Sequence, residues 1–391
     1  MKNMFRFIAG MVLFGLIVFP AQAAFTSLYI FGDGLSTTTT NDESSQSATN
    51  YYGLRKSNGR VWVELLAQEQ GLTNNYWYST NSMDGVSYTN LSASSTNWSY
   101  SSNNFSYYGN YSSNVVANLN AFTAPADASN ALFIVWVNNA DFVGDMGNLF
   151  SNYGTNITHW TNAINQSLTS HWEIITNLYY AKGARTLVMP NAVDITVIPQ
   201  YDSIVSSADK SFIRQMVINF NTAFAALLTN ATNSLPGLDI YEPDVFTLLD
   251  DMLTNSAYYG LTNALSGGQS IDALEDTSLK DKSVNGPGTN YIFWDAVDPT
   301  AKAHAQLASL AQQLLSPVQF SQITSLNGSN QLNMANVPVG QNGFVNGSTD
   351  LVNWTSVTNI NSTNATETIF VPVSGPLQFY QLSFPFAWSW P

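Results

Sequence analysis

The stretch Ile30-Phe31-Gly32-Asp33-Gly34-Leu35-Ser36 begins within the first apolar run of the mature chain, which spans Ser27 to Phe31. That run has no alternation of polar and apolar residues, which is typical of a strand buried on both faces of a parallel sheet. Small residues and one acid follow it at once, as in a tight turn. Parallel α/β folds place their chemistry at the carboxyl ends of such strands. The stretch therefore predicts an α/β fold with a candidate site beginning at Asp33.

Three more apolar runs of this kind follow, at residues 131–137, 186–189 and 238–241. Segments of helical period lie between and after them, at residues 60–70, 160–181, 208–233 and 299–315. Pro299 suits the first turn of the last helix. Strands that alternate with helices predict an α/β three-layer sandwich with a central parallel sheet, over residues 24–317.

The first 23 residues have the pattern of a secretory signal peptide. Lys2 and Arg6 precede an apolar run from Phe7 to Phe19, and Ala21-Gln22-Ala23 offers small residues for cleavage near Ala23. The apolar run is shorter than the ~20 residues that span a bilayer. We expect a secreted, periplasmic or cell-surface protein with no membrane span.

Two further regions differ in composition from the α/β part. Residues 73–130 are rich in Asn, Ser, Thr and Tyr, and they include Trp77 and Trp98. This pattern fits a polar insertion that covers one edge of the fold, or an aromatic platform for a neutral ligand such as a sugar ring. Residues 318–391 combine strand-like stretches with Asn/Gly/Ser turns, which predicts a small all-β module at the C-terminus.

Composition excludes several classes of function. The chain has 12 basic and 26 acidic residues, a formal net charge of −14, and no Lys/Arg cluster. It therefore lacks the positive surface that binding to nucleic acid needs. It has no cysteine and only three histidines, His159, His171 and His304. Thiolate zinc sites are excluded, and we expect neither a metal nor a cofactor.

Residues 31–36 resemble the first sequence block of the GDSL (SGNH) esterase/lipase family, Phe-Gly-Asp-Ser-Leu-Ser. Similar segments follow in the family's order along the chain, at residues 51–64, 136–142, 183–191, 257–263 and 293–304. The resemblance covers residues 27–316 and implies an SGNH hydrolase-like fold with acyl-ester hydrolase activity. In the C-terminal part, residues 348–355 and 379–382 resemble β-rich modules appended to secreted bacterial proteins, which implies attachment or sorting.

The resemblance also implies which positions would carry the chemistry, and this chain departs from the family at most of them. Gly34 stands where the family has its nucleophilic serine, and Asp298 stands where it has its catalytic histidine. Ala140 replaces the asparagine of the oxyanion hole. The glycine of that hole falls near Leu91 or Ser92.

The remaining family acids are present, and two side chains are candidates for relocated chemistry. Asp33, Asp141 and Asp295 are as the family has them. Ser36 lies two residues after the nucleophile position, where a capping role is favoured. His304 lies six residues after Asp298, which displaces it by roughly 9 Å along a helix, so packing or capping is favoured there too.

Three interpretations remain open from the sequence. The favoured one is a degenerate ester hydrolase that binds a small ester, lipid or carbohydrate ligand. The second is an active hydrolase in which Asp33, Asp141, Asp295 and Asp298 gather at the sheet edge. Such carboxylates could act as acid and base, or hold a hard cation. The third is a structural envelope or surface protein.

Overall fold

The structure is a computed structural model. It describes residues 25–38, 50–52, 55–70, 72, 104–202, 206–326, 328–338, 342–373, 375 and 378–384. The expected signal peptide, and the stretch 73–103 with Leu91 and Ser92, lie outside these residues. Within them, no helix has the length and apolar character needed to cross a membrane.

A parallel sheet of four strands in the order β1-β2-β3-β4 forms the centre of the N-terminal part. Its strands are β1 (Leu28–Gly32), β2 (Leu132–Trp136), β3 (Thr186–Val188) and β4 (Asp239–Tyr241). All five residues of β2 are buried, as expected for a strand covered on both faces. The predicted α/β fold with a central parallel sheet is confirmed.

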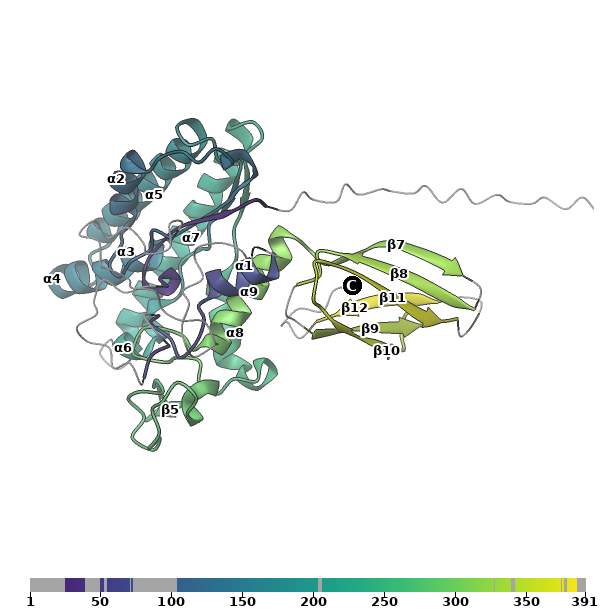
Figure 1. The fold of residues 1–391 in the computed structure, drawn as a ribbon. Helices are drawn as coiled ribbons and strands as arrows, with labels where there is room; N and C mark the ends of the chain where they lie inside the picture. The colour runs from purple at the N-terminus through teal and green to yellow at the C-terminus, as the bar shows by residue number, and fades with distance from the viewer. Residues whose placement is uncertain are drawn as a thin grey trace, which may run out of the picture.

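Helices flank this sheet (Figure 1). The main ones are α1 (Trp62–Glu69), α2 (Ser112–Ala121), α3 (Asn138–Asp145), α5 (Ile157–Tyr180), α7 (Ser207–Ser234), α8 (Val245–Thr254) and α9 (Ala301–Leu315). Shorter elements are α4 (Ser151–Tyr153), α6 (Pro199–Asp202), β5 (Leu265–Ser266) and β6 (Gln269–Ser270). Helix α1 packs against α9, while α2 and α7 pack against α5.

The segment 104–130 is integrated into the fold. Asn104 bridges to Ile30, and the amide of Phe105 donates to the carbonyl of Ile30 at 2.7 Å, so this segment covers the free edge of β1. Helix α2 follows, and it buries Val115 and Leu119. The sequence did not predict this helix, because Ser and Asn residues mask its short apolar face.

A buried ion pair fixes the start of α1. The guanidinium of Arg55 contacts the carboxylate of Glu64, and both side chains are at most 1% exposed. Glu64 also accepts a hydrogen bond from the backbone amide of Val61 at 3.0 Å. One carboxylate therefore caps the helix and holds the preceding loop against it.

The C-terminal part consists of two antiparallel sheets of three strands (Figure 1). Their orders are β10-β9-β12 and β11-β8-β7. The strands are β7 (Gln319–Leu326), β8 (Ser329–Ala335), β9 (Asn342–Ser348), β10 (Thr355–Asn361), β11 (Thr366–Pro372) and β12 (Phe379–Ser383). Their buried residues, such as Leu332, Val345 and Ile360, form a hydrophobic core separate from that of residues 28–315.

Candidate active site

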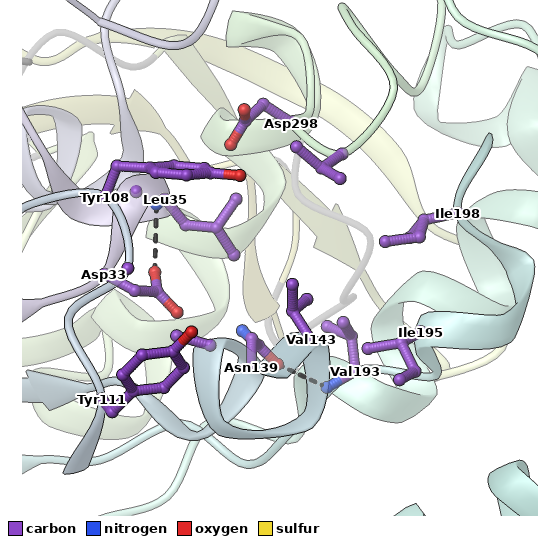
Figure 2. Close-up of a pocket in the computed structure, with 14 residues that line it drawn as sticks. Asp33, Leu35, Tyr108, Tyr111, Asn139, Val143, Val193, Ile195, Ile198 and Asp298 are labelled. Atoms are coloured by element: carbon purple, nitrogen blue, oxygen red, sulfur yellow. Dashed lines mark hydrogen bonds between the residues drawn. The ribbon is translucent and has the colours of Figure 1, made fainter. Parts of the chain in front are cut away.

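A pocket of about 110 Å³ lies at the carboxyl ends of the parallel strands. Strand β1 leads into Asp33 and the 3₁₀ turn Gly34–Ser36, and β2 leads into α3. Figure 2 shows Asp298 beside Tyr108 on one side of the pocket, with Asn139 and Val193 on the other. The pocket is lined by Asp33, Gly34, Leu35, Tyr108, Gly109, Tyr111, Asn139, Ala140, Val143, Val193, Ile195, Ile198, Val297 and Asp298.

Gly34 faces Asp298 across this pocket. A Cβ atom placed on Gly34 would lie 3.9 Å from Oδ1 of Asp298 and 3.3 Å from Cδ2 of Tyr108. The backbone of Gly34 is not in the left-handed region, so an ordinary side chain could occupy this position. The two positions that the resemblance pairs as nucleophile and base are therefore adjacent in space.

Asp295 supports the loop that carries Asp298. Its Oδ1 atom accepts hydrogen bonds from the backbone amides of Asp298 at 2.8 Å and Val297 at 3.0 Å. Its Oδ2 atom accepts from the hydroxyl of Tyr51 at 2.8 Å. The carboxylate of Asp295 is thus occupied in holding the backbone at residues 297–298, ahead of α9.

The side chain of Asp298 is buried, and its Oδ2 atom has no hydrogen-bond partner among the described residues. Burial raises the pKa of Asp298 well above its usual value, and the negative charge of Asp295 raises it further, while Lys56 opposes the shift. An unpaired polar atom in the interior costs free energy. The Oδ2 atom is therefore an unsatisfied acceptor in the interior, while the Oδ1 atom is the one nearest Gly34.

Asp33 is a second buried carboxyl in the pocket wall. It accepts a hydrogen bond from the amide of Leu35 at 3.0 Å, which caps the turn Gly34–Ser36. Burial raises the pKa of Asp33 to about 7, against the opposing effect of the backbone amides of Leu35 and Ala140. Near pH 7 the group is divided between its neutral and charged forms.

The raised pKa of Asp33 predicts that the protein loses stability as the pH rises. Between pH ~4 and ~7 the folded protein holds a proton on Asp33 that the unfolded chain releases, so the free energy of unfolding falls as the pH increases. The full shift corresponds to at most about 4 kcal/mol. In Asp33→Asn, the free energy of unfolding should fall less between pH 4.5 and pH 7.5 than it does in the natural protein. Urea unfolding of both proteins at these two pH values measures the difference. An equal decline in the variant and the natural protein would contradict the assignment.

The start of α3 places the side-chain amide of Asn139 next to Ala140, the substituted oxyanion position. Ala140 lines the pocket but has no side-chain donor. Asn139 accepts a hydrogen bond from the amide of Val193 at 3.0 Å through Oδ1, which directs its NH₂ group the other way (Figure 2). Its Nδ2 atom is buried without a partner among the described residues. Residue 139 therefore holds an unpaired side-chain donor in the interior, next to the substituted position 140.

The four aspartates do not all share one site. Asp33 and Asp298 line the pocket, but Asp141 accepts hydrogen bonds from the amide of Ser112 at 2.9 Å and from the hydroxyl of Ser167. With Asp145 it lines a polar cleft that shares Tyr111 with the pocket. The described part of the chain contains no group of three or more His, Asp or Glu side chains that could hold a metal ion.

The relocated candidates, Ser36 and His304, do not line the pocket. Ser36 is fully buried, and its hydroxyl accepts a hydrogen bond from Nε1 of Trp62 at 3.1 Å. His304 is buried in an adjoining apolar cavity, and burial lowers its pKa to about 3. A neutral imidazole in that cavity is a weak base.

Sequence reasoning did not identify Tyr108, Tyr111 or Asn139 as site residues. The two tyrosines belong to the region singled out as an aromatic platform, but nothing in its composition distinguishes them from the other tyrosines there. The Nζ atom of the Lys56 ammonium group lies 4.7 Å from the ring centroid of Tyr108. Asn139 directly precedes Ala140 in the sequence. Because Ala140 lacks the side-chain amide expected at that position, the adjacent asparagine could have been considered as an alternative donor.

The family of the chain follows from comparison with known proteins. A sequence model of the GDSL-like lipase/acylhydrolase family matches residues 28–311. This chain belongs to that family. The match includes every residue of the pocket described above.

Several relatives are GDSL esterase/lipases of Arabidopsis thaliana. One is 24% identical over 335 residues, covering 77% of this chain and 86% of the relative. A second is 22% identical over 329 residues, covering 76% and 91%. A third is 25% identical over 328 residues, covering 75% and 89%. Membership of the GDSL family supports an ester hydrolase-like function for this chain.

Proposed function

We propose that this GDSL-family protein binds a small ester or lipid ligand without forming an acyl-enzyme. The observation that carries the proposal is the pair Gly34 and Asp298. Gly34 occupies the place where the family's nucleophile would face its base, and it has no hydroxyl to attack a carbonyl.

The other substitutions act against catalysis in the same way. A carboxyl at residue 298 replaces an imidazole, and the methyl group of Ala140 donates nothing to a developing oxyanion. In serine hydrolases, loss of the nucleophile or base costs on the order of 10⁶ in turnover, and loss of an oxyanion donor costs roughly 10²–10³. Loss of the nucleophile or base removes most of the rate enhancement, and loss of the oxyanion donor lowers what remains.

The walls of the pocket support a binding role. Val143, Val193, Ile195 and Ile198 give it an apolar side, and the carboxyl groups of Asp33 and Asp298 in its wall give it polar groups. Ligand pockets have this combination of an apolar lining and a few directed polar groups.

The test is hydrolysis of p-nitrophenyl butyrate by the natural protein and by the variant Gly34→Ser/Ala140→Asn/Asp298→His. The natural protein should match the buffer rate, while the variant should exceed it. Turnover by the natural protein well above buffer would overturn the proposal.

A second candidate is a hydrolase that uses Asp298 as a general base for water. The raised pKa of this carboxyl favours it, because a base with a pKa nearer to neutral accepts protons more readily. Activity in the natural protein that Asp298→Asn abolishes would support this candidate over the binding protein.

We also propose the organisation of the chain expected from its sequence. Residues 1–23 are a signal peptide removed near Ala23, residues 24–317 are the hydrolase-like domain, and residues 318–391 are a β-rich module. The separate hydrophobic cores of the two parts support the boundary. Intact mass of the exported protein tests the cleavage, and limited proteolysis near residue 317 tests the boundary.

A further inference from the structure

We propose that the pocket binds the primary alcohol end of an aliphatic chain, with its hydroxyl in the space beside Gly34 and donating to Asp298. This inference rests on the proposed binding function and names the chemistry of its ligand. In this arrangement the ligand supplies the hydroxyl that position 34 lacks.

The first observation is the space beside Gly34. A Cβ atom on Gly34 would lie 3.9 Å from Oδ1 of Asp298, so a hydroxyl oxygen placed between the Gly34 backbone and Asp298 can come within hydrogen-bond distance of that carboxyl. Because Gly34 carries only hydrogen, the structure leaves this volume as part of the pocket.

The second observation is the unused acceptor. Asp298 is 3% exposed, and its Oδ2 atom has no partner in the described part of the chain. A hydroxyl both donates and accepts, so it can pair with this group whether the carboxyl is charged or protonated. An ether or alkyl fluoride of the same shape has no hydrogen to donate.

The third observation is the apolar path for the chain. Leu35, Val193, Ile198 and Val297 line both the pocket and the adjoining cavity of about 70 Å³. His304 also lines that cavity, and its lowered pKa keeps the imidazole uncharged near neutral pH. An alkyl chain extending from the hydroxyl would therefore contact apolar side chains, which favours binding by ~0.8 kcal/mol per buried methylene.

The fourth observation concerns charge. Asp33 and Asp298 both line the pocket, and Asp295 raises the pKa of Asp298 through its negative charge. A ligand carboxylate beside Asp298 would meet the same negative charge of Asp295, which Lys56 opposes. The pocket should therefore favour an alcohol over the corresponding carboxylate.

The experiment is calorimetric titration of the full mature chain with 1-hexanol, 1-fluorohexane and hexanoate at pH 7.5. Hexanol should bind about 10-fold more tightly than fluorohexane, as expected for one hydrogen bond to a buried carboxyl. Hexanoate should bind at least about 10-fold more weakly than hexanol.

Two variants test the position of the hydroxyl. Asp298→Leu removes the acceptor, and Gly34→Ser provides a competing hydroxyl within the protein. Both should reduce the preference for hexanol over fluorohexane to about 2-fold or less. Asp145→Asn removes a carboxyl that lines the neighbouring polar cleft but not the pocket, and it should leave the preference unchanged. Near-UV circular dichroism checks that each variant is folded.

The outcomes separate this inference from the proposed function. If fluorohexane or hexanoate binds as tightly as hexanol, the pocket binds aliphatic ligands but the alcohol assignment is wrong. If Asp145→Asn loses the preference and the two pocket variants keep it, the site is elsewhere and the assignment is also wrong. If none of the three probes binds at millimolar concentration, the binding function fails together with the inference.

Discussion

The variant Gly34→Ser/Ala140→Asn/Asp298→His is expected to hydrolyse p-nitrophenyl butyrate at least about 100-fold faster than the natural protein. The Cβ atom of the serine at position 34 would lie 3.9 Å from the present position of Oδ1 of Asp298. A histidine at position 298 could therefore reach the hydroxyl of that serine. Asp295 already fixes the backbone of residue 298, and Ala140 already lines the pocket. The main cost of the change is the 3.3 Å contact with Tyr108, which requires a small shift of that ring.

The single variants should remain near the buffer rate, since nucleophile and base act as a unit and their effects are not additive. Gly34→Ser lacks an imidazole, and Asp298→His lacks a nucleophile to deprotonate. Initial rates for the natural protein, the three single variants and the triple variant, each checked by thermal unfolding, provide the comparison. A folded triple variant that stays at the buffer rate would show that the pocket has lost esterase geometry as well as its residues.

Glu64→Ala is expected to lower the free energy of unfolding by about 3–5 kcal/mol, because it leaves the guanidinium of Arg55 buried without its carboxylate. Arg55 Nε donates to Glu64 at 3.0 Å, and the same carboxylate caps α1 through the amide of Val61. Helix α1 packs against α9, so a destabilised α1 should also weaken the packing of α9 in the N-terminal part. Urea unfolding followed by tryptophan fluorescence measures the change.

A matched control is the ion pair between Arg214 and Asp250, whose side chains are 35% and 33% exposed. Asp250→Ala should cost less than about 1 kcal/mol, because solvent screens an exposed pair and Arg214 also contacts Asp194. Equal losses in Glu64→Ala and Asp250→Ala would contradict the importance given to burial.

The strands of the parallel sheet were predictable because a strand buried on both faces requires an uninterrupted run of apolar residues. Residues 131–137 are apolar without interruption, and β2 occupies Leu132–Trp136. Helix starts were less accurate. The expected start at Trp160 missed the first turn of α5, which begins at Ile157 after Asn156 accepts a hydrogen bond from the amide of Thr158.

The candidate site was predictable in part, and for a different reason. Position in the family's blocks indicated Gly34 and Asp298, and the structure brings these two residues together. Tyr108 reaches the pocket only because residues 104–107 pair with the edge of β1, a long-range contact that no local pattern indicates. Asp141 departs from the expected grouping because α2 and α5 offer it the amide of Ser112 and the hydroxyl of Ser167.

The most direct test of the central claim is intact-mass analysis after reaction with a fluorophosphonate, which phosphonylates activated serine hydroxyls. The natural protein should keep its mass under conditions in which Gly34→Ser/Ala140→Asn/Asp298→His gains one phosphonyl group, mapped by peptide sequencing to residue 34. A stoichiometric adduct on the natural protein, at Ser36 or any other serine, would contradict the claim that this chain holds a GDSL pocket without a nucleophile.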